Sequence, residues 1–91
     1  MNAEQIREVL NREDIEGLIA LGAPEDEYDM EAEMIANAVA RHESSLDEMS
    51  LAAMVREVWI KSFSPFSEEG LSKRQPAFIR VARRVLGDLN G

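Results

Sequence analysis

Four carboxylates lie close together near the end of the first third of the chain. Glu25, Asp26, Glu27 and Asp29 surround the only tyrosine, Tyr28. Carboxylates are hard oxygen donors, which suit calcium or magnesium. An EF-hand loop, however, needs ligands at alternate positions, a mid-loop glycine and a terminal glutamate, and this loop lacks that spacing. We therefore assign no metal ligand and no cofactor, and cation binding by the loop stays an alternative.

The same loop fits two other roles. In a structural role, Gly22 and Pro24 stop one helix, Asp29 caps the next, and Tyr28 packs its ring on the core while its hydroxyl finds a polar partner. In a binding role, the loop holds more charge than a cap requires, and loops commonly host binding residues. The candidate partner-binding residues are Glu25, Asp26, Glu27, Tyr28 and Glu31.

No pair of residues forms a recognisable catalytic arrangement. His42 is the only histidine, and it is followed by Glu43, Ser44 and Ser45. Neighbouring residues on a helix do not face each other, and nucleophile, base and orienting group usually come from separate elements. A basic side chain at a helix C-terminus is the simpler interpretation of His42. We assign no catalytic residue and expect the protein not to be an enzyme.

The charge is distributed unevenly along the chain. Residues 1–60 hold 4 basic and 15 acidic side chains, whereas residues 61–91 hold 6 basic and 3 acidic ones. A net charge of −8 disfavours nucleic acids and anionic membranes, which are polyanions, and favours a protein partner with a basic surface. The simpler alternative is that this charge only keeps a small protein soluble. The basic C-terminal part is expected to offset the acidic first half.

Composition places the chain among cytoplasmic globular proteins. Its 91 residues favour a single helical domain over residues 1–91, and a chain with 45% hydrophobic residues is too apolar to be disordered. Cysteine is absent, which fits a reducing compartment. We see no signal peptide at the N-terminus and no apolar run long enough to span a membrane.

Apolar residues recur at helical spacing in most of the chain. The first expected helix covers residues 3–11, with Asn2 as its N-cap. Asp14 is expected to cap a short helical segment over residues 15–21, which Gly17 weakens. A third helix is expected over residues 30–41, beginning after Asp29.

The second half is expected to hold two more helices. Ser45 and Glu48 have the spacing of a capping box, and the helix that they open ends near residue 63, before Ser64 and Pro65. Residues 66–75 hold at most a helical turn, and Pro76 at the first helical position opens the last helix, residues 77–89. These elements predict an all-α fold: a small antiparallel bundle of about four main helices with short connections.

The segment from Asp14 to Asp29 resembles a family of small bacterial proteins. The run Asp14-Ile15-x-Gly17-Leu18-Ile19, followed by Gly22-Ala23-Pro24-Glu25-Asp26-Glu27-Tyr28-Asp29, is similar to the motifs of the YugE-like family, a domain of unknown function. The chain departs from that pattern at Glu13, where the family often has tryptophan, and at Met30, where it usually has proline. The resemblance covers about residues 10–65 and implies a small four-helix fold.

The functional hypothesis is a non-enzymatic acidic protein that acts by protein–protein interaction. Related loops occur in small proteins encoded beside polymorphic toxins, so the resemblance implies, at its most specific, an immunity protein that blocks a basic toxin surface. The alternative is a structural or regulatory helical module that pairs with a copy of itself as a homodimer. Its apolar faces and methionines fit either core packing or a groove for a partner helix.

Overall fold

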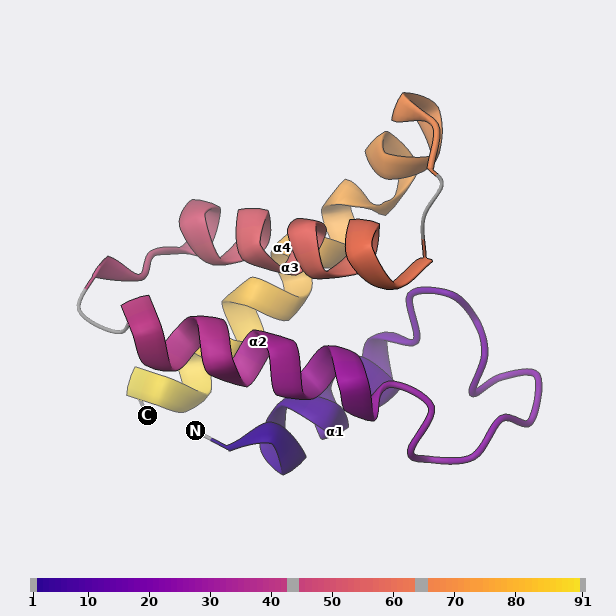
Figure 1. Cartoon of the computed structure of the whole chain (residues 1–91), viewed down its shortest axis with the longest axis horizontal. Coiled ribbons are helices and arrows are strands. Elements are labelled where there is room, and N and C mark those ends of the chain that lie inside the picture. Colours follow the sequence, from indigo (N-terminus) through magenta and orange to yellow (C-terminus); the bar gives the residue numbers. More distant parts are fainter. Residues whose placement is uncertain (1, 43–44, 64–65, 91) are drawn as a thin grey trace.

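The part of the chain that the structure describes folds into four α-helices, and the predicted small all-α bundle is confirmed. A computed structural model describes residues 2–42, 45–63 and 66–90, without the side chains of residues 89 and 90. The helices are α1 (Ala3–Glu13), α2 (Asp29–His42), α3 (Glu48–Phe63) and α4 (Glu68–Asn90). Each helix packs against two others, α1 on α2 and α4, and α3 on α2 and α4 (Figure 1). No helix in these ranges is long and apolar enough to cross a membrane.

Helix α1 begins as its sequence predicts. The Asn2 side chain accepts a hydrogen bond from the Gln5 amide at 2.9 Å, and the Gln5 side chain accepts one from the Asn2 amide at 3.0 Å. This reciprocal pair is a capping box, which satisfies amides that the first helical turn leaves without partners. The predicted apolar face is buried, since Ile6, Val9 and Leu10 all lie in the core.

The expected helix over residues 15–21 does not form. Gly17 has a φ of 72° and Asp14 a φ of 45°, both in the left-handed region, and a right-handed helix cannot continue through such residues. Residues 14–28 instead make a long connection built from turns, which extends from one side of the bundle (Figure 1). The expectation that all connections are short is therefore wrong at this position.

Helix α3 begins with a different cap from the one expected. Asp47 Oδ1 accepts a hydrogen bond from the Ser50 amide at 2.8 Å, and Ser50 Oγ accepts one from the Asp47 amide at 3.0 Å. The capping box is thus Asp47 with Ser50, two residues later than the predicted pair of Ser45 and Glu48. The helix ends at Phe63 as predicted. Ser64 and Pro65, to which we assigned that end, lie outside the described residues.

Helix α4 starts nine residues earlier than predicted and contains Pro76 in its interior. Because proline has no backbone N–H, Pro76 cannot donate a hydrogen bond to the Ser72 carbonyl, four residues earlier. Both Pro76 and Ser72 are exposed, so water can satisfy that carbonyl on the outer face of the helix. The turns before the proline are held by Leu71, which packs against the core, and by Arg74, described below.

The core is centred on Trp59, which is fully buried on α3. Its indole ring lies 5.8 Å from the ring of Tyr28, 5.1 Å from that of Phe63 and 6.2 Å from that of Phe78, measured between centroids. Aromatic rings at such distances contribute attraction beyond the burial of their surface. These contacts join the end of the 14–28 connection to α3 and α4.

Candidate functional site

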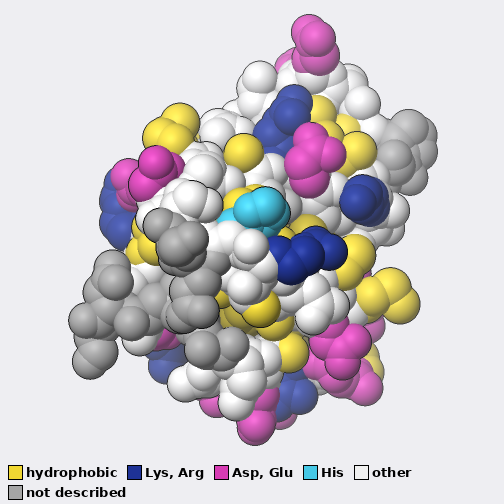
Figure 2. Space-filling view, turned by 60° about the vertical axis from the view of Figure 1, so that its left-hand side comes forward, with side chains coloured by type: hydrophobic (Ala, Val, Ile, Leu, Met, Phe, Trp, Pro, Cys, Tyr) yellow, Lys and Arg dark blue, Asp and Glu magenta, His cyan; other side chains and the backbone are white. Residues whose placement is uncertain are grey.

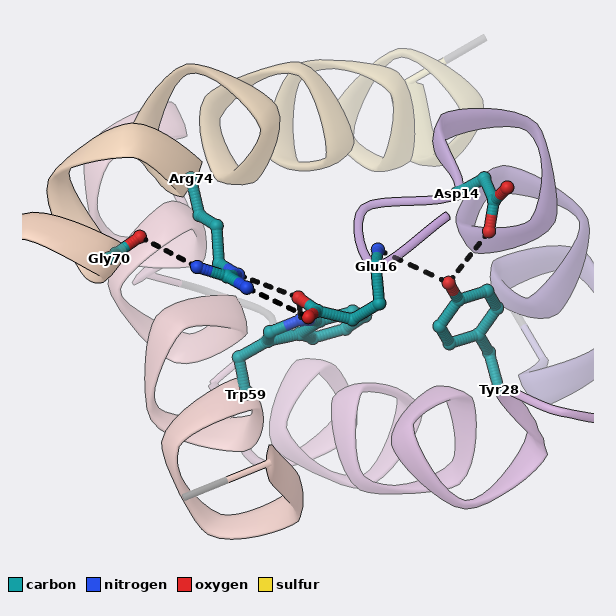
Figure 3. A network of polar contacts seen from close by, with 6 residues as sticks. All are labelled: Asp14, Glu16, Tyr28, Trp59, Gly70 and Arg74. Carbon is teal, nitrogen blue, oxygen red and sulfur yellow. Dashed lines mark hydrogen bonds and ion pairs between the residues drawn. The ribbon is translucent and has the colours of Figure 1, made fainter. Parts of the chain in front are cut away.

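The connection over residues 14–28 is closed by a hydrogen bond between its first and last residues. The Tyr28 hydroxyl donates to Asp14 Oδ1 at 2.7 Å and accepts from the Glu16 amide at 3.3 Å (Figure 3). The Tyr28 ring is 0% exposed. The prediction of a buried ring with a polar partner for its hydroxyl is therefore confirmed, and Asp14 is that partner.

Asp14 also organises the first half of the connection. Its carboxylate accepts hydrogen bonds from the Ile19 amide at 3.0 Å and the Ala20 amide at 2.9 Å. A side chain that capped a helix would bond the amides two or three residues ahead, whereas Asp14 reaches five and six residues ahead. The carboxylate thus holds a turn structure in place of the expected helix.

Hydrogen bonding sets the protonation of this pair. Desolvation acts to raise the pKa of Asp14, but the Ile19 and Ala20 amides and the Tyr28 hydroxyl stabilise the carboxylate and lower its pKa overall. Burial and the bond to Asp14 raise the pKa of Tyr28 well above its ordinary value. The phenol therefore stays protonated, and it donates to an ionised carboxylate at neutral pH.

Glu16 links the 14–28 connection to both α3 and α4. Its carboxylate accepts from Trp59 Nε1 at 2.8 Å and from Arg74 Nε and Nη2 at 2.7 and 2.9 Å (Figure 3). The two parallel bonds from the guanidinium are the bidentate geometry in which arginine binds carboxylates most strongly. The Arg74 bonds lower the pKa of Glu16 against the opposing effect of desolvation, and the Trp59 bond lowers it further.

Arg74 is itself held in place from two other directions. Its Nη1 donates to the Gly70 carbonyl at 2.9 Å, and its guanidinium lies 4.6 Å from the centre of the Phe66 ring. The Glu16 carboxylate raises the pKa of Arg74, so the pair is fully ionised. Residues 14–20 are consequently fixed to the bundle by polar contacts from α3, α4 and Tyr28.

The second half of the connection carries the predicted acidic residues at the surface. Glu25, Asp26 and Glu27 are all exposed, and none of their carboxylates forms an ion pair with another described residue. The backbone beneath them is tied down, because Asn11 Nδ2 donates to the Glu25 carbonyl at 2.9 Å and the Glu27 amide to the Pro24 carbonyl at 3.1 Å. We call Glu25, Asp26 and Glu27 the acidic loop.

Two apolar side chains flank the acidic loop in the chain. Leu21 is 84% exposed, and Met30 is 69% exposed. Exposed apolar side chains of this kind can supply contact area if a partner covers the loop. The sequence predicts Leu21 as the end of a helix and gives no signal that it belongs to the candidate surface.

The other two predicted binding residues do not reach the surface. Tyr28 points inward to Asp14, and Glu31 is only 5% exposed because it faces the bundle beside Ala32 and Ile35 in α2. The structure therefore places the Tyr28 and Glu31 side chains in the interior, apart from the three exposed candidates. Partner binding by Glu25, Asp26 and Glu27 stays a prediction.

Asp29 does not have the predicted role of N-cap. It is the first residue of α2, and the Tyr28 carbonyl accepts the first helical hydrogen bond, from the Ala32 amide at 2.9 Å. The Asp29 carboxylate instead lies 3.6 Å from an Arg7 guanidinium nitrogen of α1. This contact is a half-exposed ion pair between α1 and α2.

The remaining candidate positions are His42, with the residues that follow it, and the carboxylates considered as metal ligands. Within residues 2–42, 45–63 and 66–90, no three His, Asp or Glu side chains are placed to hold a metal ion. His42 lies exposed in the last turn of α2. Glu43 and Ser44, which follow it, lie outside the described residues.

Comparison with known proteins adds no relative to this description. No protein-family model, no curated protein and no solved structure matches the chain.

Proposed function

We propose that this protein is a non-enzymatic binding protein that engages a basic surface of another protein through the acidic loop. The observation that supports this most directly is that three consecutive carboxylates are exposed and form no ion pair within the described residues. Glu13, Glu16 and Glu48 are paired with arginines of α4, whereas Glu25, Asp26 and Glu27 form no ion pair within the described residues. Their charge is available to a partner.

The support of the loop is the second argument. Connections of this length without regular secondary structure are uncommon in small domains and are usually functional. A surface that is ordered before it meets its partner loses less conformational entropy on binding. The bonds of Asp14, Glu16 and Asn11 supply such ordering on the inner side, while the carboxylates face outward.

The most specific form of the proposal is an immunity protein that blocks a basic toxin surface. It rests on the YugE-like resemblance and on related loops in proteins encoded beside toxins. In this form the acidic loop covers the basic surface, and Leu21 and Met30 supply apolar contact area at its edge. Complementary charge would make association fast and sensitive to salt.

The experiment compares two variants with the same net charge. Glu25→Gln/Asp26→Asn/Glu27→Gln removes the acidic loop, and Glu8→Gln/Glu33→Gln/Glu68→Gln removes three other exposed carboxylates. Partners are captured from the native host with each protein, and association rates are measured between about 0.05 and 0.5 M salt. We expect the loop variant alone to lose capture and salt dependence. Equal behaviour of the two variants, or a rate indifferent to salt, would contradict the proposal.

A further inference from the structure

A groove with a mainly apolar lining lies between α2 and α3. It has a volume of about 460 Å³ and lies open to solvent. Its apolar lining comes from two methionines and three small or branched residues, namely Met34, Ala38, Ala53, Met54 and Val58. Figure 2 shows this face, with hydrophobic side chains around the histidine and beside basic side chains. None of the lining residues belongs to the 14–28 connection.

The charges of the groove follow a definite order along its length. Helices α2 and α3 run side by side in opposite directions (Figure 1), so the C-terminal part of α2 lies beside the N-terminal part of α3. Arg41 and His42 therefore lie at one end of the groove and Lys61 at the other. Glu57 and Asn37 lie between them. The side chains along the groove are therefore basic at one end, acidic or neutral in the middle, and basic at the other end.

The two ends of the groove are basic, although the net charge of the molecule is −8. Arg41 and Lys61 are both exposed, and neither forms an ion pair within the described residues, whereas Arg74, Arg80 and Arg83 are each paired with a glutamate. A ligand that meets this groove can supply the missing carboxylates. Glu57 in the middle disfavours a uniformly acidic ligand and restricts the negative groups to the two ends.

The dimensions of the groove fit a helix. Arg41 follows Met34 by seven positions, which corresponds to about 10 Å along a helix axis. Positions i and i+7 of a partner helix are separated by the same distance and share a face with i+3 and i+4. Ala38 and Ala53 leave room for a backbone, and Met34 and Met54 can adapt their shapes to the apolar side chains of a partner. Open grooves between two helices commonly receive a third helix in this way.

We propose that the α2–α3 groove binds an amphipathic helix of a partner protein that carries carboxylates two turns apart, with apolar residues between them. The carboxylate at one end meets Arg41 and His42, and the carboxylate at the other end meets Lys61. The apolar residues lie on Met34, Ala38, Met54 and Val58. This inference does not depend on the acidic loop and concerns a separate surface of opposite charge.

The probe is a labelled helical peptide that contains Glu-x-x-Leu-Leu-x-x-Glu in an alanine-rich host, measured by fluorescence anisotropy at about 0.15 M salt. We expect saturable binding below about 1 mM. Arg41→Gln/Lys61→Gln should weaken it roughly three- to tenfold, as two exposed ion pairs are lost. A peptide with glutamines in place of both glutamates should bind the wild-type protein more weakly by the same factor. Its affinity should not fall further when the protein carries Arg41→Gln/Lys61→Gln, because the ion pairs are already absent.

Two further variants locate the site. Ala53→Glu places a carboxylate in the groove at an exposed position and should abolish binding while the circular dichroism spectrum is unchanged. Arg12→Gln/Arg84→Gln removes two exposed arginines outside the groove and should change the affinity by less than about twofold, since salt screens distant charges. Absence of saturable binding, or an equal loss in the Arg12 and Arg84 variant, would overturn the proposal. A fatty acid such as dodecanoate is the other occupant that an apolar groove with basic ends could take, and its binding without binding of the peptide would also overturn the proposal.

Discussion

Glu16 and Arg74 lie 58 residues apart in the chain, and their side chains meet in a bidentate ion pair with bonds of 2.7 and 2.9 Å. The same carboxylate accepts the Trp59 indole N–H, so a single side chain links the connection between α1 and α2 with α3 and α4. Both partners of the pair are mostly buried. The 14–28 connection is thereby part of the folded body rather than an appendage.

The first prediction concerns the stability that this pair supplies. Glu16→Gln keeps the size of the side chain but removes its charge and places an amide group against the guanidinium. We expect the free energy of unfolding to fall by about 2 kcal/mol, because hydrogen bonds to charged groups contribute more than neutral ones. Urea unfolding monitored by circular dichroism measures the change.

The matched control for Glu16 is Glu13. Its carboxylate also pairs with an arginine of α4, Arg80, at 2.8 Å, but that pair is more exposed. Glu13→Gln should cost no more than about 0.5 kcal/mol, as is usual for surface ion pairs. Equal losses in the two variants would show that the Glu16 contact is no stronger than an ordinary surface pair.

The second prediction concerns the hydroxyl of Tyr28. Tyr28→Phe preserves the ring stacked on Trp59 but removes the bond to Asp14 and the acceptor for the Glu16 amide. Asp14 keeps its two backbone donors, so the expected loss is about 1 kcal/mol. For a domain of this size, that corresponds to a fall in melting temperature of about 4–8 °C. An unchanged melting temperature would show that the hydroxyl does not help to close the connection.

The third prediction is a loss of stability in acid. The pKa values of Asp14 and Glu16 are both lower in the folded protein than their ordinary values. The unfolded chain therefore binds protons first, at pH values near 4, and the folded chain only at lower pH. The stability from these groups is complete above about pH 5 and is lost progressively as the pH falls through their folded pKa values.

Unfolding free energies at several pH values between 7 and 3 test this dependence. Asp14→Asn and Glu16→Gln remove the titrating groups, and asparagine tolerates the left-handed backbone of residue 14. We expect each variant to be less stable than the wild type at pH 7 but to lose less stability on acidification. If both variants keep the full wild-type pH dependence, other carboxylates cause the acid sensitivity.

Much of the bundle could be predicted because its signals are local. Asn2 and Gln5 cap α1 with each other, and Ile6, Val9 and Leu10 repeat at helical spacing, so short-range physics determines this helix. The buried ring of Tyr28 could be predicted from its amphipathic chemistry, although its partner Asp14 could not. Where residues a few positions apart decide the outcome, sequence and structure agree.

The sequence-based predictions fail where tertiary contacts override local preference. Pro76 predicts a helix start, yet the turns before it are helical because Arg74 and Leu71 hold them to the bundle. Glu16 carried no signal for its role, since its partner Arg74 lies 58 residues away in another helix. The acidic residues of the loop were found from sequence because exposure requires no long-range partner.

The fourth prediction separates the charge of the acidic loop from its architecture. Glu25→Gln/Asp26→Asn/Glu27→Gln removes three exposed carboxylates that form no ion pair within the described residues. The contact that fixes this segment uses the Glu25 carbonyl rather than its carboxylate, so it survives the substitution. Relief of repulsion between adjacent like charges should leave the free energy of unfolding unchanged or raise it by up to about 0.5 kcal/mol. Urea unfolding of the variant at low salt measures this change, and a loss of more than about 1 kcal/mol would show that the charges are structural.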